Sequence, residues 1–113
     1  MDKIIVDHPD AKIIGPIPFE TQKEMAKMGA YLNIVLNPGW WDHDPFEIVE
    51  HIKEIGAEHC ILSTDVGHAW QATPIEMMRS NIKLLEFCGL NKEDIDIMTK
   101  KNPAKILGLA DQQ

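Results

Sequence analysis

The segment CILSTDVGHAW, residues 60–70, joins a short apolar run to a group of polar and ring-bearing side chains. This run and the earlier run at 3–6 are nearly continuous in apolar residues, so both fit strands that are covered on both faces, as is typical of parallel sheets. Asp65, Gly67 and His68 follow the run at 60–62 directly, although a simple connecting loop needs neither a carboxylate nor an imidazole. A buried strand that ends in such groups predicts a functional site at its carboxyl end.

Two similar apolar runs precede this one. The three runs cover residues 3–6, 32–36 and 60–62, so their starts are almost evenly spaced along the chain. A polar loop that contains Pro or Gly follows each run, and a helix signal follows each loop. Strands that alternate with helices at a regular interval predict a parallel β/α architecture.

The helix signals are specific. DPFE (44–47) and TPIE (73–76) both combine a capping side chain, Pro in the first turn and Glu three residues after the cap. The first helix is expected at 19–28, after Pro18. Glycines end all three helices, at positions 29, 56 and 89.

Apolar stripes predict the buried faces of the second and third helices. The second stripe contains Phe46, Val49, Ile52 and Ile55. The third contains Ile75, Met78, Ile82 and Leu85, with Leu84 and Cys88 beside it. Glu47, His51 and Glu54 lie opposite the second stripe or at its edge, and we expect them to form a solvated face.

Beyond Gly89 the chain is expected to be helical. Asn91 caps a helix over 91–98, and Asn102 with Pro103 begins a second, short one. The expected fold is of the α/β class, with three parallel β/α units and C-terminal helices. It forms one partial β/α domain over 1–113, in which 90–109 is a helical extension.

The composition excludes several classes of partner. The formal net charge of −7 argues against a nucleic-acid partner, which would require a basic surface. Neither a long apolar segment nor a basic cluster suggests a membrane partner. Cys60 and Cys88 lie in apolar contexts without a CxxC motif, so we expect two reduced, buried thiols and a cytoplasmic location.

The loops that follow the strands are long, at 7–18, 37–44 and 63–73, whereas those that precede the strands are short. In β/α folds the loops at the carboxyl ends of the strands build the active site. These three loops contain His8, Asp10, Trp40, Trp41, Asp42, His43, Asp65, His68 and Trp70.

Two groups of residues in the second loop allow alternatives. Trp40 and Trp41 fit either a pocket wall, an interface, or packing of the loop against the mouth of the fold. Asp42, His43 and Asp44 have a metal-like composition, but Asp44 serves the following helix as a cap.

Four segments together resemble the closing third of the amidohydrolase superfamily, most nearly its phosphotriesterase-like members. They are IIVDHP (4–9), GAYLNIVL (29–36), CILSTDVGH (60–68) and IKLLEFCGLNKEDIDIMTKKNPAKILGL (82–109). The family consists of metal-dependent hydrolases on a (β/α)8 TIM barrel that act on small-molecule substrates. The resemblance therefore implies that the three strands correspond to the last three of such a barrel.

The resemblance also implies roles for particular residues. His8, at the end of the sixth barrel strand, would be a ligand to a divalent metal, zinc or manganese. Asp65, at the end of the eighth, would contact the metal and accept a proton from the attacking water. From its place in the loop beyond Asp65, rather than from the resemblance, His68 would contact substrate or stabilise charge across the pocket. From the residues alone, His8 and His68 also fit surface loops, and Asp65 also fits a turn before Gly67.

The chain departs from the family because it contains no His-x-His motif and only three strands. We expect it to be either a piece of a longer protein or a truncated relative, with weak or absent metal binding and no hydrolysis by the chain alone. The alternative function is a non-catalytic β/α module for oligomerisation or binding. Because a three-stranded parallel sheet leaves two bare edges, we expect a homo-oligomer or the missing N-terminal part of the barrel.

Overall fold

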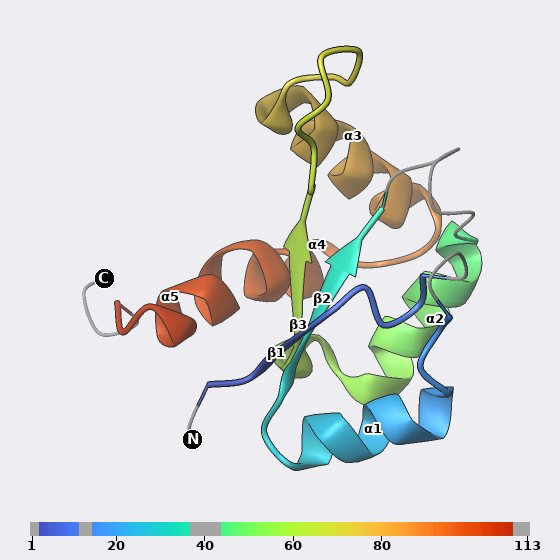
Figure 1. Ribbon diagram of the computed structural model, residues 1–113, viewed down its shortest axis with the longest axis vertical. Coiled ribbons are helices and arrows are strands. Elements are labelled where there is room, and N and C mark those ends of the chain that lie inside the picture. The colour runs from blue at the N-terminus through green and yellow to red at the C-terminus, as the bar shows by residue number, and fades with distance from the viewer. Residues whose placement is uncertain (1–2, 12–14, 37–43, 110–113) are drawn as a thin grey trace.

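The computed structural model describes residues 3–11, 15–36 and 44–109, which fold around one parallel sheet (Figure 1). The strands are β1 (Ile5–Asp7), β2 (Tyr31–Val35) and β3 (Cys60–Ser63). They pair in the order β1-β2-β3, with Asp7 opposite Asn33 and Leu32 opposite Cys60. The prediction of three parallel strands joined by helices is confirmed.

Three helices follow the three strands. They are α1 (Phe19–Lys27), α2 (Pro45–Ile55) and α3 (Pro74–Phe87), and a short turn η2 (Ala57–His59) leads into β3. Asp44 caps α2 by accepting a hydrogen bond from the Phe46 amide at 3.0 Å. Thr73 caps α3 in the same way, with the Glu76 amide as donor at 3.3 Å. Both predicted caps are confirmed.

The C-terminal segment is one continuous helical stretch rather than two separate helices. It consists of α4 (Lys92–Asp96), a π-helical turn η3 (Ile97–Lys101) and α5 (Asn102–Ile106). The predicted cap at Asn91 is confirmed, because its side chain accepts from the Asp94 amide at 2.8 Å. Pro103 does not break the helix: it lies in the first turn of α5, where proline is tolerated, directly after the π-helical turn.

The core lies on one face of the sheet. Leu32, Ile34, Cys60 and Leu62 project toward Val49 and Ile52 of α2 and Met98 of η3, and all of these are buried. The opposite face carries Ile5, Asp7, Asn33, Ile61 and Ser63, which are exposed or half-buried in the described part of the chain. The expectation that β1 is covered on both faces is therefore wrong, since Ile4 and Ile5 are 46% and 44% exposed.

The predicted apolar stripes are correct only in part. Phe46 and Ile75 are exposed, although both begin a predicted buried stripe. Ile48 is buried in α2, and the polar residue Asn81 is buried in α3. Phe46 instead meets Phe87 of α3 edge to face, with 6.3 Å between ring centroids. Periodicity alone therefore overstates how much of each stripe is covered.

The carboxyl ends of β2 and β3 point toward α3 and the loop before it, whereas α1 lies near their amino ends (Figure 1). The predicted functional face is thus the end of the sheet nearest α3. No helix in the described ranges is both long and apolar enough to cross a bilayer.

Candidate functional site

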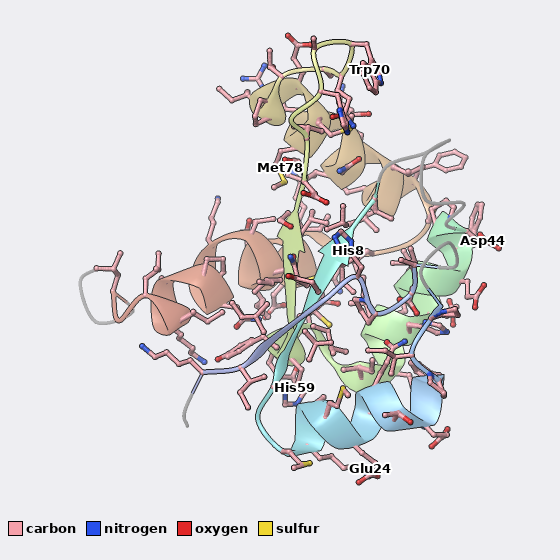
Figure 2. All side chains as sticks on the ribbon, viewed as in Figure 1. His8, Glu24, Asp44, His59, Trp70 and Met78 are labelled. Atoms are coloured by element: carbon pink, nitrogen blue, oxygen red, sulfur yellow. The ribbon has the colours of Figure 1, made fainter. Side chains whose placement is uncertain are left out.

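The structure brings together the two residues predicted to bind metal. His8 follows the end of β1 and Asp65 lies two residues beyond the end of β3. His8 Nε2 lies 3.2 Å from Asp65 Oδ2, and the side chains are 18% and 53% exposed, respectively. In Figure 2, His8 lies beside the head of the β2 arrow. β2 is the strand between β1 and β3, from whose ends His8 and Asp65 extend. A histidine and a carboxylate from opposite edges of the sheet thus meet over its carboxyl end.

Both residues have an unusual backbone. His8 has φ 50° and Asp65 has φ 48°, and among the described residues no other non-glycine residue has a positive φ. This left-handed conformation is disfavoured for residues with a Cβ atom, although His and Asp tolerate it better than most. It occurs directly after β1 and two residues after β3, and such strain is concentrated at functional sites.

A second polar network crosses the open face of the sheet directly below the pair. Ser63 Oγ donates to Asn33 Oδ1 at 2.8 Å, and Asn33 Nδ2 donates to Asp7 Oδ1 at 2.9 Å. Each strand contributes one member. This network was not predicted, and its only signal in the sequence is Asn33, a polar residue in the middle of an otherwise apolar strand.

A third polar cluster lies beneath the loop after β1. Asp10 Oδ1 is 2.9 Å from Gln22 Nε2 of α1 and 3.2 Å from His51 Nδ1 of α2. The His51 ring stacks on Phe19, with 4.1 Å between centroids. The expectation of a solvated face is therefore wrong for His51, whose side chain is enclosed by Phe19 and Asp10. It is correct for Glu47 and Glu54, which are exposed.

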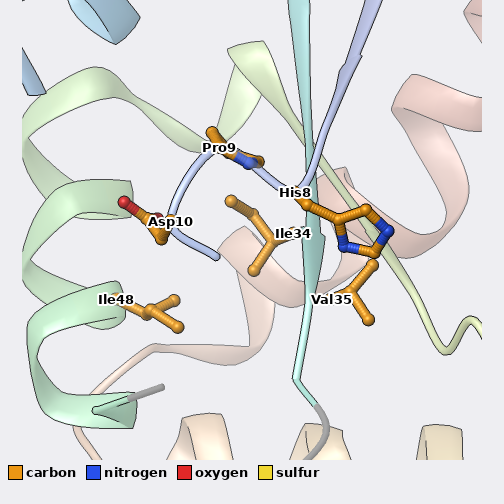
Figure 3. A pocket seen from close by; sticks show the side chains of 6 residues that line it. All are labelled: His8, Pro9, Asp10, Ile34, Val35 and Ile48. Carbon is orange, nitrogen blue, oxygen red and sulfur yellow. The ribbon is translucent and has the colours of Figure 1, made fainter. Parts of the chain in front are cut away.

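A narrow crevice separates this cluster from the His8–Asp65 pair. It is lined by His8, Pro9, Asp10, Ile34, Val35 and Ile48, and it leaves no room for a water molecule. In Figure 3 the side chains of His8 and Asp10 lie on opposite sides of Ile34. The loop after β1 therefore packs tightly on β2, with one polar side chain on each side.

The predicted substrate contact, His68, lies in the loop between β3 and α3. Its ring stacks on Trp70 at a centroid distance of 4.4 Å, and Gln71 Oε1 accepts from the amides of Gly67 and His68, both at 2.9 Å. Figure 2 places Trp70 at the tip of this loop, well away from His8. His68 is therefore held near the tip, and its contact with substrate stays a prediction.

Four other candidates, Trp40, Trp41, Asp42 and His43, lie outside the described residues. Both cysteines are free, as expected, but only Cys60 is fully buried and Cys88 is half-buried. Burial raises the pKa of the Cys60 thiol to about 12, and it raises the pKa of Cys88 as well. A raised pKa keeps the reactive thiolate form of a cysteine scarce.

The His8–Asp65 pair fits part of a metal site. Two donors that share one tetrahedral zinc ion at its usual bond lengths are about 3.4 Å apart. The observed separation of 3.2 Å between His8 Nε2 and Asp65 Oδ2 is close to this value. However, no group of three or more His, Cys, Asp or Glu residues is placed to hold a metal within 3–11, 15–36 and 44–109. The pair can therefore supply two ligands and leaves the remaining positions to other groups.

No protein-family model matches the sequence, and neither a curated protein nor a solved structure matches the chain. A function therefore has to be inferred from the residues themselves. An imidazole and a half-exposed carboxylate in contact can hold a divalent cation or transfer a proton. Both possibilities make the carboxyl end of the sheet, where the pair lies, the candidate functional site.

Proposed function

We propose that this chain is a member, or a part of a member, of the metal-dependent hydrolases of the amidohydrolase superfamily, built on the last strands of a TIM barrel. The observation that carries this proposal is the contact of 3.2 Å between His8 and Asp65 at the carboxyl ends of β1 and β3. Catalytic residues of β/α barrels lie at this end of the strands. The two strained backbones at these same positions support it further.

Each residue has a distinct role in this proposal. His8 would hold the cation through Nε2 and Asp65 through Oδ2. When bound, the cation lowers the pKa of a water molecule and polarises the substrate. Asp65 is the more exposed of the two, so it can accept a proton from the attacking water while His8 remains fixed against the sheet. His68 would contact a small-molecule substrate, which could be an ester, an amide, a lactone or a phosphoester.

Metal binding by this chain alone should be weak. Tight zinc sites use three or four protein ligands, and the described residues supply two. We therefore expect no hydrolysis by the chain alone, unless His43, His68 or a second copy completes the site. The free cysteines fit a reducing compartment, and we propose the cytoplasm.

A zinc titration of isotope-labelled protein, purified without a metal-affinity tag, tests this proposal. We expect the first NMR signals to shift or broaden to be those of His8 and Asp65, with weak affinity. Asp65→Asn should abolish the response. Glu58→Gln is the matched control, because Glu58 faces His59 at 3.8 Å at the amino end of β3.

Two results would contradict the proposal. The first is a zinc response that begins at His59, and the second is a response at His8 that Asp65→Asn leaves unchanged. Elemental analysis addresses the strength of the site separately. One tightly held zinc per chain, lost in Asp65→Asn, would show that the site is complete, and only the expectation of weak binding would then be wrong.

The alternative function, a non-catalytic module for oligomerisation or binding, is favoured by the exposed β1 edge. Ile4 and Ile5 are exposed there, and β1 pairs with no strand but β2 in the described ranges. Proteins seldom leave an apolar sheet edge bare, so we expect a dimer or a larger assembly. Light scattering should show it, and Ile5→Lys should weaken it, whereas Leu107→Lys at the exposed end of the C-terminal helices should not.

A monomer of 12.8 kDa at high concentration would contradict this expectation. The two functions are then separated by the zinc titration. An assembly that gives no zinc response at His8 or Asp65 would favour the binding module. An assembly with that response would favour the hydrolase.

A further inference from the structure

A buried glutamine lies directly below the loop that carries His8. Gln22 of α1 is only 1% exposed, and its side-chain nitrogen Nε2 faces three oxygens. These are the Pro9 carbonyl at 3.3 Å, Asp10 Oδ1 at 2.9 Å and the Ile17 carbonyl at 2.9 Å. All three belong to the loop between β1 and α1. A buried amide needs partners for its N–H groups, so this side chain ties both ends of the loop together.

His51 holds the same loop from a second helix. Its Nδ1 lies 3.2 Å from Asp10 Oδ1, and its ring is fixed by stacking on Phe19. The Asp10 side chain is therefore held by α1 through Gln22 and by α2 through His51. Because both helices pack on the sheet, the position of Asp10 is fixed relative to the strands.

The backbone transmits this position to His8. The Ile17 amide donates to the Pro9 carbonyl at 2.8 Å, and the Ala11 amide donates to the His8 carbonyl at 3.2 Å. Pro9 is fully buried, and the crevice around it leaves no room for water. Residues 9–11 are therefore fixed. The left-handed conformation of His8 joins β1 to them and directs the His8 ring toward Asp65.

We propose that Gln22 is a positioning residue, which acts through Pro9 and Asp10 to hold His8 in the strained conformation that brings Nε2 to Asp65. An unrestrained histidine prefers a negative φ, so His8 should relax and its ring should leave Asp65 once the restraint is removed. The purpose of this positioning rests on the proposed hydrolase function. The positioning itself is a conformational property that can be measured without metal.

The test measures whether the His8 ring lies against Asp65, from the change that Asp65→Asn causes in the NMR signals of the ring. In the otherwise unchanged protein, Asp65→Asn should shift the ring-nitrogen NMR signals of His8 at a fixed pH. In a Gln22→Met background, which preserves side-chain volume but removes both donors, the shift caused by Asp65→Asn should fall to less than about half. Gln22→Glu should have the same effect, because it places a second acceptor against Asp10.

Asn102→Leu is the matched control, because Asn102 is also a buried amide, but its side chain donates to the carbonyls of Ala57 and Cys60 at the amino end of β3, away from both His8 and Asp65. It should leave the response of His8 to Asp65→Asn unchanged. A general loosening of the protein would reduce the response in this control too, and that result would overturn the inference. The amide signals of β2 and β3 verify that each variant is folded.

The inference would also be overturned if Asp65→Asn shifted the His8 signals as far in folded Gln22→Met and Gln22→Glu as it does in the otherwise unchanged protein. Should both variants unfold, Asp10→Ala decides by the same comparison, since it removes the acceptor that Gln22 and His51 share while leaving both side chains in place. The measurement uses no metal. A failed zinc titration would therefore refute the proposed function and leave the positioning role standing, and the reverse also holds.

Discussion

The two ends of β3 differ in almost every physical respect. At its amino end, the buried Asn102 donates through Nδ2 to the carbonyls of Ala57 and Cys60, at 2.9 and 2.7 Å. At its carboxyl end, Asp65 is half-exposed and has a left-handed backbone, and the loop beyond it carries the exposed Trp70 at its tip. β3 is thus fixed at its amino end, and at its carboxyl end it leads to Asp65, a carboxylate residue with a strained backbone. Functional side chains gain precision when they extend from such a fixed element.

The largest effect is expected at the fixed end. Asn102→Ala removes the donor for two buried carbonyls, so the free energy of unfolding should fall by about 3 kcal/mol. Urea denaturation measures the loss. Asn91→Ala, at the exposed cap of α4, should cost only about 1 kcal/mol. Equal losses in the two variants would mean that the amino end of β3 is not specially fixed.

Cys60 makes the same end sensitive to alkaline pH. Its pKa is raised from 9.0 to about 12, chiefly by burial, so the folded protein keeps the proton that the unfolded chain loses. The associated stability is complete below pH 9 and declines as the pH rises toward 12. At pH 10 the loss should be on the order of 1 kcal/mol. Cys60→Ala should remove this pH dependence, and an unchanged slope in that variant would assign it to another group.

A smaller effect is expected where the loop after β3 ends. Thr73→Ala removes the cap of α3, so the free energy of unfolding should fall by about 1 kcal/mol, as measured by thermal or urea denaturation. The Thr73 hydroxyl is exposed and its bond to the Glu76 amide is long, at 3.3 Å. A loss as large as that of Asn102→Ala would reverse the comparison between the two ends of β3.

The smallest effect has the opposite sign. Asp65→Gly removes the side chain from a left-handed position, so the free energy of unfolding should rise by about 0.5 kcal/mol, after subtraction of the flexibility of glycine. The zinc response at His8 should disappear in the same variant. Thr64→Gly, at a neighbouring residue with an ordinary backbone, should lower stability. A loss of stability in Asp65→Gly would argue that Asp65 serves the fold rather than a site.

Local chemistry accounts for what was predictable from the sequence. The caps at Asp44 and Thr73 use atoms within three residues, so their motifs predict them directly. The contact between His8 and Asp65 was predictable because parallel strands present their carboxyl ends at the same end of the sheet. The lengths of the loops identified that end as the functional one.

Long-range burial accounts for what was missed. Gln22, His51 and Asn102 look like ordinary polar helix residues, yet each bonds to a group that is distant in sequence. Periodicity distinguishes apolar from polar faces, but it does not say which polar side chain a neighbouring segment will cover. The exposure of Phe46 and Ile75 has the same cause, since coverage depends on where neighbouring elements end.

The Asn102 contacts also bear on the order in which the protein folds. Each strand pairs with the next one along the chain, with α1 between the first two and α2 between the last two. The bonds from Asn102, in contrast, span 45 and 42 residues. Contacts that close longer loops are slower to form, so the sheet should assemble before the C-terminal segment docks on it. The hydrogen bonds of Asn102 should then form after the folding transition state. Their loss should raise the rate of unfolding and leave the rate of folding almost unchanged.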